Sequence, residues 1–301
     1  MPRHHIVPQM ILRRFANSRD QICMHPRGGD GPPYLIAIRK ACSEVGFYEI
    51  PTDDVAEDYQ ADHDPEFVEH ILADIEGTAN QIIADILSGD YPLDPRRRFK
   101  LTLFLALQMS RGWSFREGMN QVAQNVLEQA AQARFPEIAS SELPTITASK
   151  AFAIQHSLRV GVEVLMNYLY FRTWRILRFD TPCLLTSDSP FGYWAPPDRE
   201  DDGPFGVGNA PIVFFPLDRA TVLAMSQSVG RDQTVRSGLT RARQVNYSVA
   251  VEAQKWIMHH QDDAPLTGVR LPPLGRFVSE YVHETVSNDG EVRQLFQIIK
   301  R

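Results

Sequence analysis

The sequence predicts an α+β protein in which a mainly helical first half packs on a second half of mixed strands and helices. Three observations support this class. Apolar residues recur at helical spacing through most of residues 65–134. Short apolar runs between turn residues become common from residue 183 onward. The 301 residues are 43% hydrophobic and 23% charged, which are ordinary values for a globular chain that can bury a large core.

The N-terminal segment is expected to fold into the body of the protein. Leu12 and Phe15 lie three residues apart, so a helical turn would place both on one buried face. Two strands are predicted at 21–25 and 34–38, with a Gly- and Pro-rich turn between them. Residues 52–66 carry seven carboxylates without the glycine and alternation of a calcium loop, so we interpret them as a solvated loop.

Helices are predicted next. The first covers 65–88, with one apolar stripe and Gly89 at its end. A second begins at Asp94-Pro95, runs to about Gly118 and continues helical to 134. We expect one domain over residues 1–301. A linker with two prolines at 135–147 is the point at which the chain could divide into 1–134 and 148–301.

The second half is expected to begin with a long helical segment over 148–179, bent near Gly161. A further helix is predicted at 239–260, and a Pro-, Gly- and Asp-rich loop at 195–210. Short strands are expected at 183–186, 212–215, 221–225, 277–285 and 292–299.

Composition limits the classes of protein. A net charge of −6 argues against binding nucleic acid through bulk positive charge. Three cysteines without paired spacing favour a reducing cytoplasm. The N-terminus has no apolar signal segment, and the longest apolar run, 101–107, is too short for a membrane span. We therefore expect a cytoplasmic protein without a membrane partner; the sequence indicates no oligomeric state.

Polar residues on apolar helix faces indicate a candidate site, because a buried polar group without a partner costs about 1–3 kcal/mol. The helix around 99–109 is apolar on nearly all sides, and Gln108 and Arg111 share one face of it. A buried arginine needs a carboxylate, carbonyl groups or a bound anion. Arg111 is therefore either a structural brace or, with Gln108, a binder of an anionic substrate. Asp188 is its expected partner.

Three further polar residues belong to this group. Glu76 flanks the apolar stripe of the first long helix. Asn246 lies on the apolar face of the helix at 239–260, beside small residues that leave room for a ligand or another segment. Asp188 follows a short strand, on a Ser-, Asp- and Pro-rich turn of the kind that often carries chemistry or caps. Each also has a structural interpretation, as a boundary glutamate, a satisfied asparagine and an ion-pair partner.

His4 and His5 are adjacent, so in an extended segment they point to opposite sides, and one is expected to enter a site as acid or base. They superficially resemble the start of a His-Asn-His nuclease motif, but no ββα pattern or metal histidine follows. Phosphate-binding loops, dinucleotide fingerprints and common hydrolase motifs are absent. His259 and His260 are interpreted as a frayed helix end. We assign no metal ligand and identify no cofactor.

Taken together, these residues resemble a family of bacterial proteins catalogued as a domain of unknown function. Its N-terminal His-x-x-Pro-x-x-x-Leu-x-x-Phe pattern is matched by His5, Pro8, Leu12 and Phe15. The other landmarks are Gly46-Phe47-Tyr48, Glu76, Leu107-Gln108 with Arg111, Thr186-Ser187-Asp188 with Pro190, Phe215-Pro216-Leu217 and Asn246. Gly112-Trp113 departs from the family pattern, in which Thr-Pro commonly follows the arginine. The resemblance implies no established reaction, but it suggests that the polar residues form one site.

Two functions stay open. The first is a hydrolase or transferase that acts at a phosphate or acyl centre of a small-molecule or anionic substrate, with histidine as acid or base. Its catalytic candidates are His4, His5, Glu76 and Asp188, and its substrate-binding candidates are Gln108, Arg111 and Asn246. A metal could be held by histidine, Glu76 and Asp188, but no spacing requires one. The second is a binding or sensor module, for example in bacterial defence or toxin systems, in which these residues form a structural network.

Overall fold

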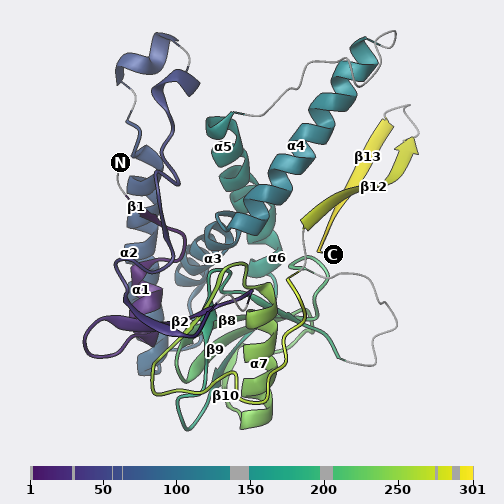
Figure 1. The fold of residues 1–301 in the computed structure, drawn as a ribbon. Helices are drawn as coiled ribbons and strands as arrows, with labels where there is room; N and C mark the ends of the chain where they lie inside the picture. The colour runs from purple at the N-terminus through teal and green to yellow at the C-terminus, as the bar shows by residue number, and fades with distance from the viewer. Residues whose placement is uncertain are drawn as a thin grey trace.

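The computed structural model describes residues 3–28, 31–55, 57–62, 64–135, 149–196, 206–274, 277–286 and 292–300. Most of its helices stand above two sheets, and one helix, α7, lies in front of them (Figure 1). The expected linker at 135–147, apart from its first residue, and the middle of the expected loop at 195–210 lie outside the described residues. Among the described helices, none combines the length and hydrophobicity that crossing a membrane requires.

The first half of the chain is mainly helical, as predicted. Its helices are α1 (Gln9–Leu12), α2 (Phe67–Ser88), α3 (Pro95–Ser110) and α4 (Trp113–Arg134), with 3₁₀ turns at Arg13–Phe15 (η1), Thr52–Asp54 (η2) and Glu57–Asp62 (η3). Gly89 ends α2 in the left-handed conformation, with φ of 108°. Asp94 starts α3, because its side chain accepts hydrogen bonds from the N–H groups of Arg96 and Arg97.

The helix predicted to run from Asp94 to about Gly118 is divided earlier than expected. The α3 helix ends at Ser110, and Gly112 takes an extended conformation, with ψ of 154°, before α4 begins. Arg111 therefore lies at the C-terminal end of α3 rather than inside a longer helix. This placement lets its side chain reach the neighbouring α2.

The helix predicted over 148–179 is wrong at its C-terminal end. The structure has α5 (Lys150–Val160), a π-helical turn η4 (Gly161–Leu165) and α6 (Met166–Tyr170), followed by strand β5 (Thr173–Arg178). The helix changes type at the predicted bend, where Gly161 packs closely on α3: a Cβ there would lie 2.6 Å from Ser110 Oγ. The apolar run after α6 is a strand because it pairs with strands on both sides, which its period alone cannot reveal.

The larger sheet has the strand order β10-β5-β9-β8-β7, and all its pairs except β10-β5 are antiparallel. Its other strands are β7 (Gly192–Trp194), β8 (Ile212–Asp218), β9 (Thr221–Ser226) and β10 (Gln233–Arg236). The strands predicted at 212–215 and 221–225 are confirmed. Phe104 of α3 contacts Phe215 on one face of this sheet, with ring centroids 6.2 Å apart.

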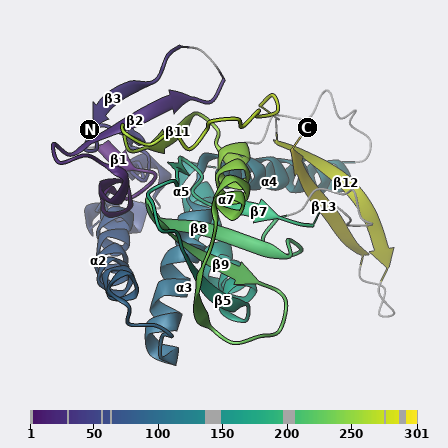
Figure 2. The same cartoon turned by 90° about the horizontal axis from the view of Figure 1, so that it is seen from below.

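The helix α7 (Leu239–Glu252) packs on the other face of this sheet. A Cβ added at Gly192 of β7 would lie 2.8 Å from Ser248 Cβ of α7, so only glycine allows this approach. Figure 2 shows α7 between the larger sheet and the four-stranded sheet. It therefore contacts strands of both sheets, β7 and β8 of one and β6 (Thr186–Ser187) of the other.

The four-stranded sheet is antiparallel, with the order β3-β2-β11-β6. Its strands are β2 (Gln21–Pro26), β3 (Tyr34–Ala37), β6 (Thr186–Ser187) and β11 (Trp256–His259). The strands predicted at 21–25 and 34–38 are confirmed. The helix predicted over 239–260 is wrong at its C-terminal end, because the chain leaves the helical path after Glu252 and forms β11.

Two strand pairs complete the fold. They are β1 (Arg3–His5) with β4 (Ser43–Val45), and β12 (Phe277–Val286) with β13 (Val292–Lys300), both antiparallel. After β1, Leu12 and Phe15 are fully buried, as predicted. The N-terminal segment is thus part of the core, and it carries the two histidines to the side of α2 and α3.

Candidate functional site

Arg111 is the centre of a buried polar group at the end of α3. Its side chain is only 2% exposed, and its Nη1 donates to Glu76 Oε1 of α2 over 2.6 Å. Its Nε donates to Gln108 Oε1 over 2.8 Å, and its Nη2 donates to the same oxygen. These bonds use three of the five N–H groups of the guanidinium. The group therefore joins α2 to α3, and two N–H groups of the guanidinium remain beyond these three bonds.

The predicted ion pair between Arg111 and Asp188 is wrong. The carboxylate of Asp188 accepts hydrogen bonds from the backbone N–H groups of Gln254, Lys255 and Trp256, at 2.9, 2.6 and 3.1 Å. Burial raises the pKa of Asp188 to about 6, although these three donors act in the opposite direction. Asp188 thus shapes the turn between α7 and β11, and it explains why the predicted helix stops there.

His5 lies close to the Arg111 group. Gln108 Nε2 donates to the backbone carbonyl of Ile6 over 3.0 Å, so α3 is bonded directly beside this histidine. Burial lowers the pKa of His5, and the charge of Arg111 acts in the same direction, whereas backbone hydrogen bonding with Ile38 and Arg39 and the charge of Glu76 act to raise it. Its buried Nε2 has no hydrogen-bond partner in the part of the chain that the structure describes. His5 therefore offers a neutral imidazole beside a buried cation.

His4 is held in a different environment. Its Nδ1 accepts the N–H of Tyr48 over 2.7 Å, and its Nε2 lies 2.9 Å from Glu66 Oε2. Since Nδ1 accepts, Nε2 carries the hydrogen and donates to the carboxylate. The side chain is 1% exposed and its ring stacks on Tyr48. His4 therefore anchors the N-terminal strand, and His5 is the histidine with an unused nitrogen.

Two aromatic side chains with buried donors lie near this group. Tyr48 Oη and Trp113 Nε1 are buried, and neither has a partner among the described residues. Phe47 contacts both rings, with centroids 4.8 Å from Tyr48 and 6.3 Å from Trp113. Burial raises the pKa of Tyr48, and the positive charge of Arg111 opposes that shift. The surroundings of Arg111 are therefore rich in donors without acceptors.

Sequence reasoning missed several members of this environment. Glu69 precedes Glu76 by seven residues on α2, so the two share a helix face, and that spacing could have found it. Burial raises the pKa of Glu69, and the charges of His4, Glu76 and Arg111 act on it as well. Glu66 belongs to the acidic segment that we interpreted as a solvated loop, and no local pattern distinguishes it from its neighbours.

Asn246 lies apart from the Arg111 group. Its Oδ1 accepts the N–H of Leu185 over 3.2 Å, and its Nδ2 donates to the carbonyls of Cys183 and Pro265, at 2.8 and 3.2 Å. The amide thus uses its donors and acceptor on the backbone. These contacts favour the structural interpretation of Asn246, as a brace between α7 and the segments beside it.

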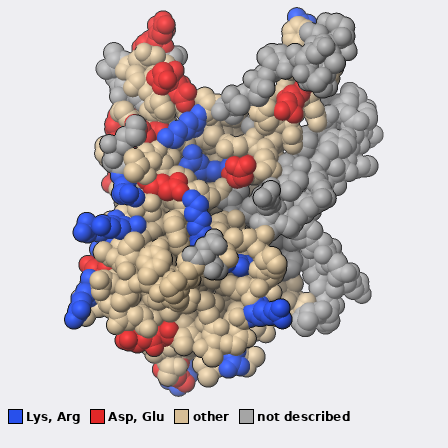
Figure 3. All heavy atoms as spheres, in the orientation of Figure 1, with Lys and Arg blue, Asp and Glu red and all other residues tan. Residues whose placement is uncertain are grey.

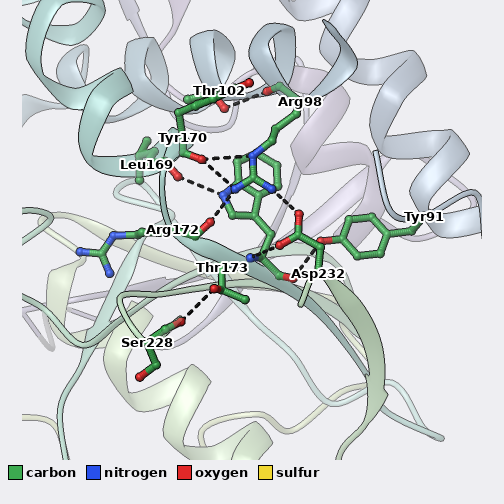
Figure 4. Close-up of polar contacts among 10 residues, drawn as sticks. Tyr91, Arg98, Thr102, Leu169, Tyr170, Arg172, Thr173, Ser228 and Asp232 are labelled. Carbon is green, nitrogen blue, oxygen red and sulfur yellow. Dashed lines mark hydrogen bonds and ion pairs between the residues drawn. The ribbon is translucent and has the colours of Figure 1, made fainter. Parts of the chain in front are cut away.

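Arg98 is a useful comparison, because its hydrogen bonds are all structural (Figure 4). Its Nε donates to the Tyr170 carbonyl over 3.1 Å, its Nη1 donates to Asp232, and its guanidinium lies 4.5 Å from the Trp174 ring centroid. Asp232 Oδ1 accepts the N–H of Trp174 over 2.8 Å, and Tyr91 Oη donates to the Trp174 carbonyl over 2.9 Å. This network joins α3 to β5, and neither Arg98 nor Asp232 was identified from the sequence.

One group of side chains could hold a metal ion. Cys23 and His25 of β2 and His259 of β11 each offer a ligand atom, and these atoms lie within 4.8 Å of one another. The interpretation of His259 as part of a frayed helix end is wrong, because it belongs to a strand and is only 5% exposed. None of the seven candidate residues from the sequence belongs to this group.

Two surface cavities lie elsewhere. One of about 800 Å³ is lined by 26–28, Tyr247 and 270–274, and one of about 600 Å³ by 193–195, 240–248 in part and 268–270. Neither is lined by a residue of the Arg111 group. On the face drawn in Figure 3, Lys and Arg gather with Asp and Glu between the regions of α2 and α4, rather than forming a uniformly basic surface.

The fold and the site define an α+β protein whose N-terminal segment is bonded, through the Ile6 carbonyl next to His5, to a buried Arg–Glu–Gln group. Residues 3–263 match the family model described as "Protein of unknown function (DUF4238)", which covers most of the chain. The chain belongs to this family, and the predicted resemblance to a domain of unknown function is confirmed at that level. No curated protein and no solved structure matched the chain.

Proposed function

We propose that this protein is an enzyme that hydrolyses or transfers a group at a phosphate or acyl centre of a small anionic substrate. The observation that carries the proposal is the set of buried polar atoms without partners beside Arg111. Within the described residues, these are His5 Nε2, Tyr48 Oη and Trp113 Nε1, and the three bonds of Arg111 use three of its five N–H groups. Unpaired buried groups are uncommon in native proteins, and an anion would supply acceptors for the Tyr48, Trp113 and Arg111 donors, while His5 Nε2 keeps a free lone pair.

His5 is the proposed general base. Its lowered pKa keeps the ring neutral at pH 7, so Nε2 can take a proton from water or an alcohol. The oxygen of that nucleophile then bonds to the phosphorus or the acyl carbon. The bond to the leaving group breaks, and the imidazolium returns the proton to that group. Arg111 and Tyr48 would donate to the oxygen on which negative charge develops.

Glu76 and Gln108 have a positioning role in this proposal. Their oxygens accept N–H groups of Arg111, which fixes the plane of the guanidinium. Asp188 and Asn246 are given no part in the chemistry, because their side chains bond backbone groups elsewhere. We also propose a cytoplasmic location, which the absence of disulfides among the three free cysteines supports.

A second candidate function is a binding or sensor module in which the same group is a structural network. The observation that favours it is the bond from Gln108 Nε2 to the Ile6 carbonyl, since that bond ties the N-terminal segment to α3. The two functions differ in what Tyr48 does. In a structural network, a buried hydroxyl without a partner contributes no stabilising bond. In a catalytic site, the same hydroxyl can donate a hydrogen bond to the substrate.

The test is a screen of phosphodiester, phosphate-monoester and acyl substrates, followed by Tyr48→Phe. We expect this variant to lose at least about tenfold in kcat/KM, equivalent to about 1.4 kcal/mol of transition-state stabilisation, without a lower melting temperature. Tyr91→Phe is the matched control, because that hydroxyl makes a structural bond. It should lower the melting temperature and keep the activity per folded molecule. Full activity of Tyr48→Phe would contradict the proposal.

A further inference from the structure

We infer that Cys23, His25 and His259 bind one zinc ion or a similar divalent transition metal. One ligand atom from each residue lies within 4.8 Å of the other two. A thiolate and two imidazoles are ligands that zinc takes in proteins, and soft sulfur selects against magnesium and calcium. The inference concerns a different set of residues from the Arg111 group, and it does not depend on the proposed enzymatic activity.

The sheet itself brings the three side chains together. Cys23 and His25 are two residues apart on β2, so they project from the same face. The antiparallel register places His259 of β11 directly opposite Cys23, and opposed residues share a face. Donor atoms around tetrahedral zinc are separated by roughly 3.3–3.6 Å, given its bond lengths to nitrogen and sulfur. The three ligand atoms would therefore have to approach one another by about 1 Å to coordinate one ion.

The hydrogen bonds of these residues suit ligation. His259 Nδ1 donates to the His260 carbonyl over 2.7 Å, which leaves the lone pair on Nε2. Backbone carbonyls orient metal-binding histidines in this way. Within the described ranges, neither the thiol of Cys23 nor the ring of His25 has a hydrogen-bond partner. Both are half-buried, so an ion can enter and water can occupy a fourth position.

Metal binding would have two consequences. A cysteine thiol is mostly protonated at neutral pH, so the metal must release that proton as the sulfur–metal bond forms. The ion would also cross-link β2 to β11, two strands whose ligands are far apart in the sequence. The metal would thus link the antiparallel pair β2-β3 to β11, the strand that follows α7.

The experiment uses the full chain after removal of metal by a chelator. We expect titration with Co²⁺ to produce a thiolate-to-cobalt charge-transfer band that saturates at one equivalent and is displaced by Zn²⁺. Calorimetry with Zn²⁺ in two buffers of different ionisation enthalpy should show release of about one proton per ion. Zn²⁺ should also raise the melting temperature.

Cys23→Ser should abolish the cobalt band, and both Cys23→Ser and His25→Gln should weaken Zn²⁺ binding by at least about tenfold. His25→Gln serves as a second variant, because its half-buried ring can be replaced without opening the core. Cys183→Ser is the matched control, since it removes a half-buried thiol outside the group, and it should bind metal as the natural chain does. No stoichiometric binding by the natural chain, or a cobalt band that survives in Cys23→Ser, would overturn the inference.

Discussion

The side-chain amide of Gln108 donates to the backbone carbonyl of Ile6 over 3.0 Å, while its oxygen accepts from Arg111. One side chain thus connects the N-terminal segment to the buried cation. The Ile6 carbonyl and the Arg111 N–H groups are buried, so each would lose a hydrogen-bond partner if the Gln108 amide were removed. The carbonyl next to His5 is therefore fixed relative to the guanidinium, which is the arrangement that the proposed chemistry needs.

Gln108→Leu keeps the shape of the side chain and removes both of these interactions. We expect the free energy of unfolding to fall by about 1–3 kcal/mol, because buried groups lose their partners. Urea denaturation measures this change. Gln124→Leu is the control, since the Gln124 amide donates to Glu128 on an exposed part of α4, and it should change stability by no more than about 0.5 kcal/mol. Equal effects of the two variants would show that the Gln108 bonds contribute little.

Arg111→Lys keeps the positive charge but loses the planar guanidinium. We expect activity per folded molecule to fall by at least about tenfold, because a lysine cannot hold Glu76 and Gln108 and also face an anion. Arg98→Lys is the comparison, and it should lower the melting temperature while leaving activity per folded molecule unchanged. If both arginine variants change only stability, Arg111 is a structural brace and the second candidate function is favoured.

Asp188→Ala should destabilise the protein by about 1–3 kcal/mol or more at pH 7. The reason is that the buried N–H groups of residues 254–256 lose their acceptor, so the turn between α7 and β11 is left unsatisfied. Chemical denaturation measures the loss. Asp180→Ala removes an exposed carboxylate and should have little effect. A small effect of Asp188→Ala would mean that water replaces the carboxylate.

The pKa of His5 predicts a specific pH dependence of stability. Burial lowers this pKa below the ordinary value of about 6.5, so the unfolded chain binds the proton more tightly than the folded protein. The stability associated with neutral His5 is complete above about pH 6.5 and is lost as the pH falls toward the lowered pKa. Urea midpoints between about pH 5 and 8 should therefore depend less on pH in His5→Gln than in the natural chain. His70→Gln is the comparison, since it removes an exposed histidine whose ring Nδ1 lies 3.1 Å from a carboxylate oxygen of Asp64. Parallel profiles for the natural chain and His5→Gln would contradict this prediction.

Local sequence determined much of the fold. The apolar stripe of α2, the end at Gly89, the start of α3 at Asp94 and the strands β2 and β3 were predicted because helix periods, caps and strand runs depend on residues close together in the chain. The burial of Leu12 and Phe15 follows from the same logic. The sequence also identified Arg111 as a buried charge that requires partners, since its helix is apolar on nearly every side.

Tertiary structure alone decided which partners those are. Glu76 rather than Asp188 accepts from Arg111, because α2 packs beside α3 while the carboxylate of Asp188 is already surrounded by backbone N–H groups. The segments that became β5 and β11 are too short for periodicity to distinguish strand from helix, and pairing across the sheets settled their form. The approach of Cys23 to His259 has the same origin: it arises from the register of β2 against β11, and residues so far apart in the sequence leave no local pattern by which to predict it.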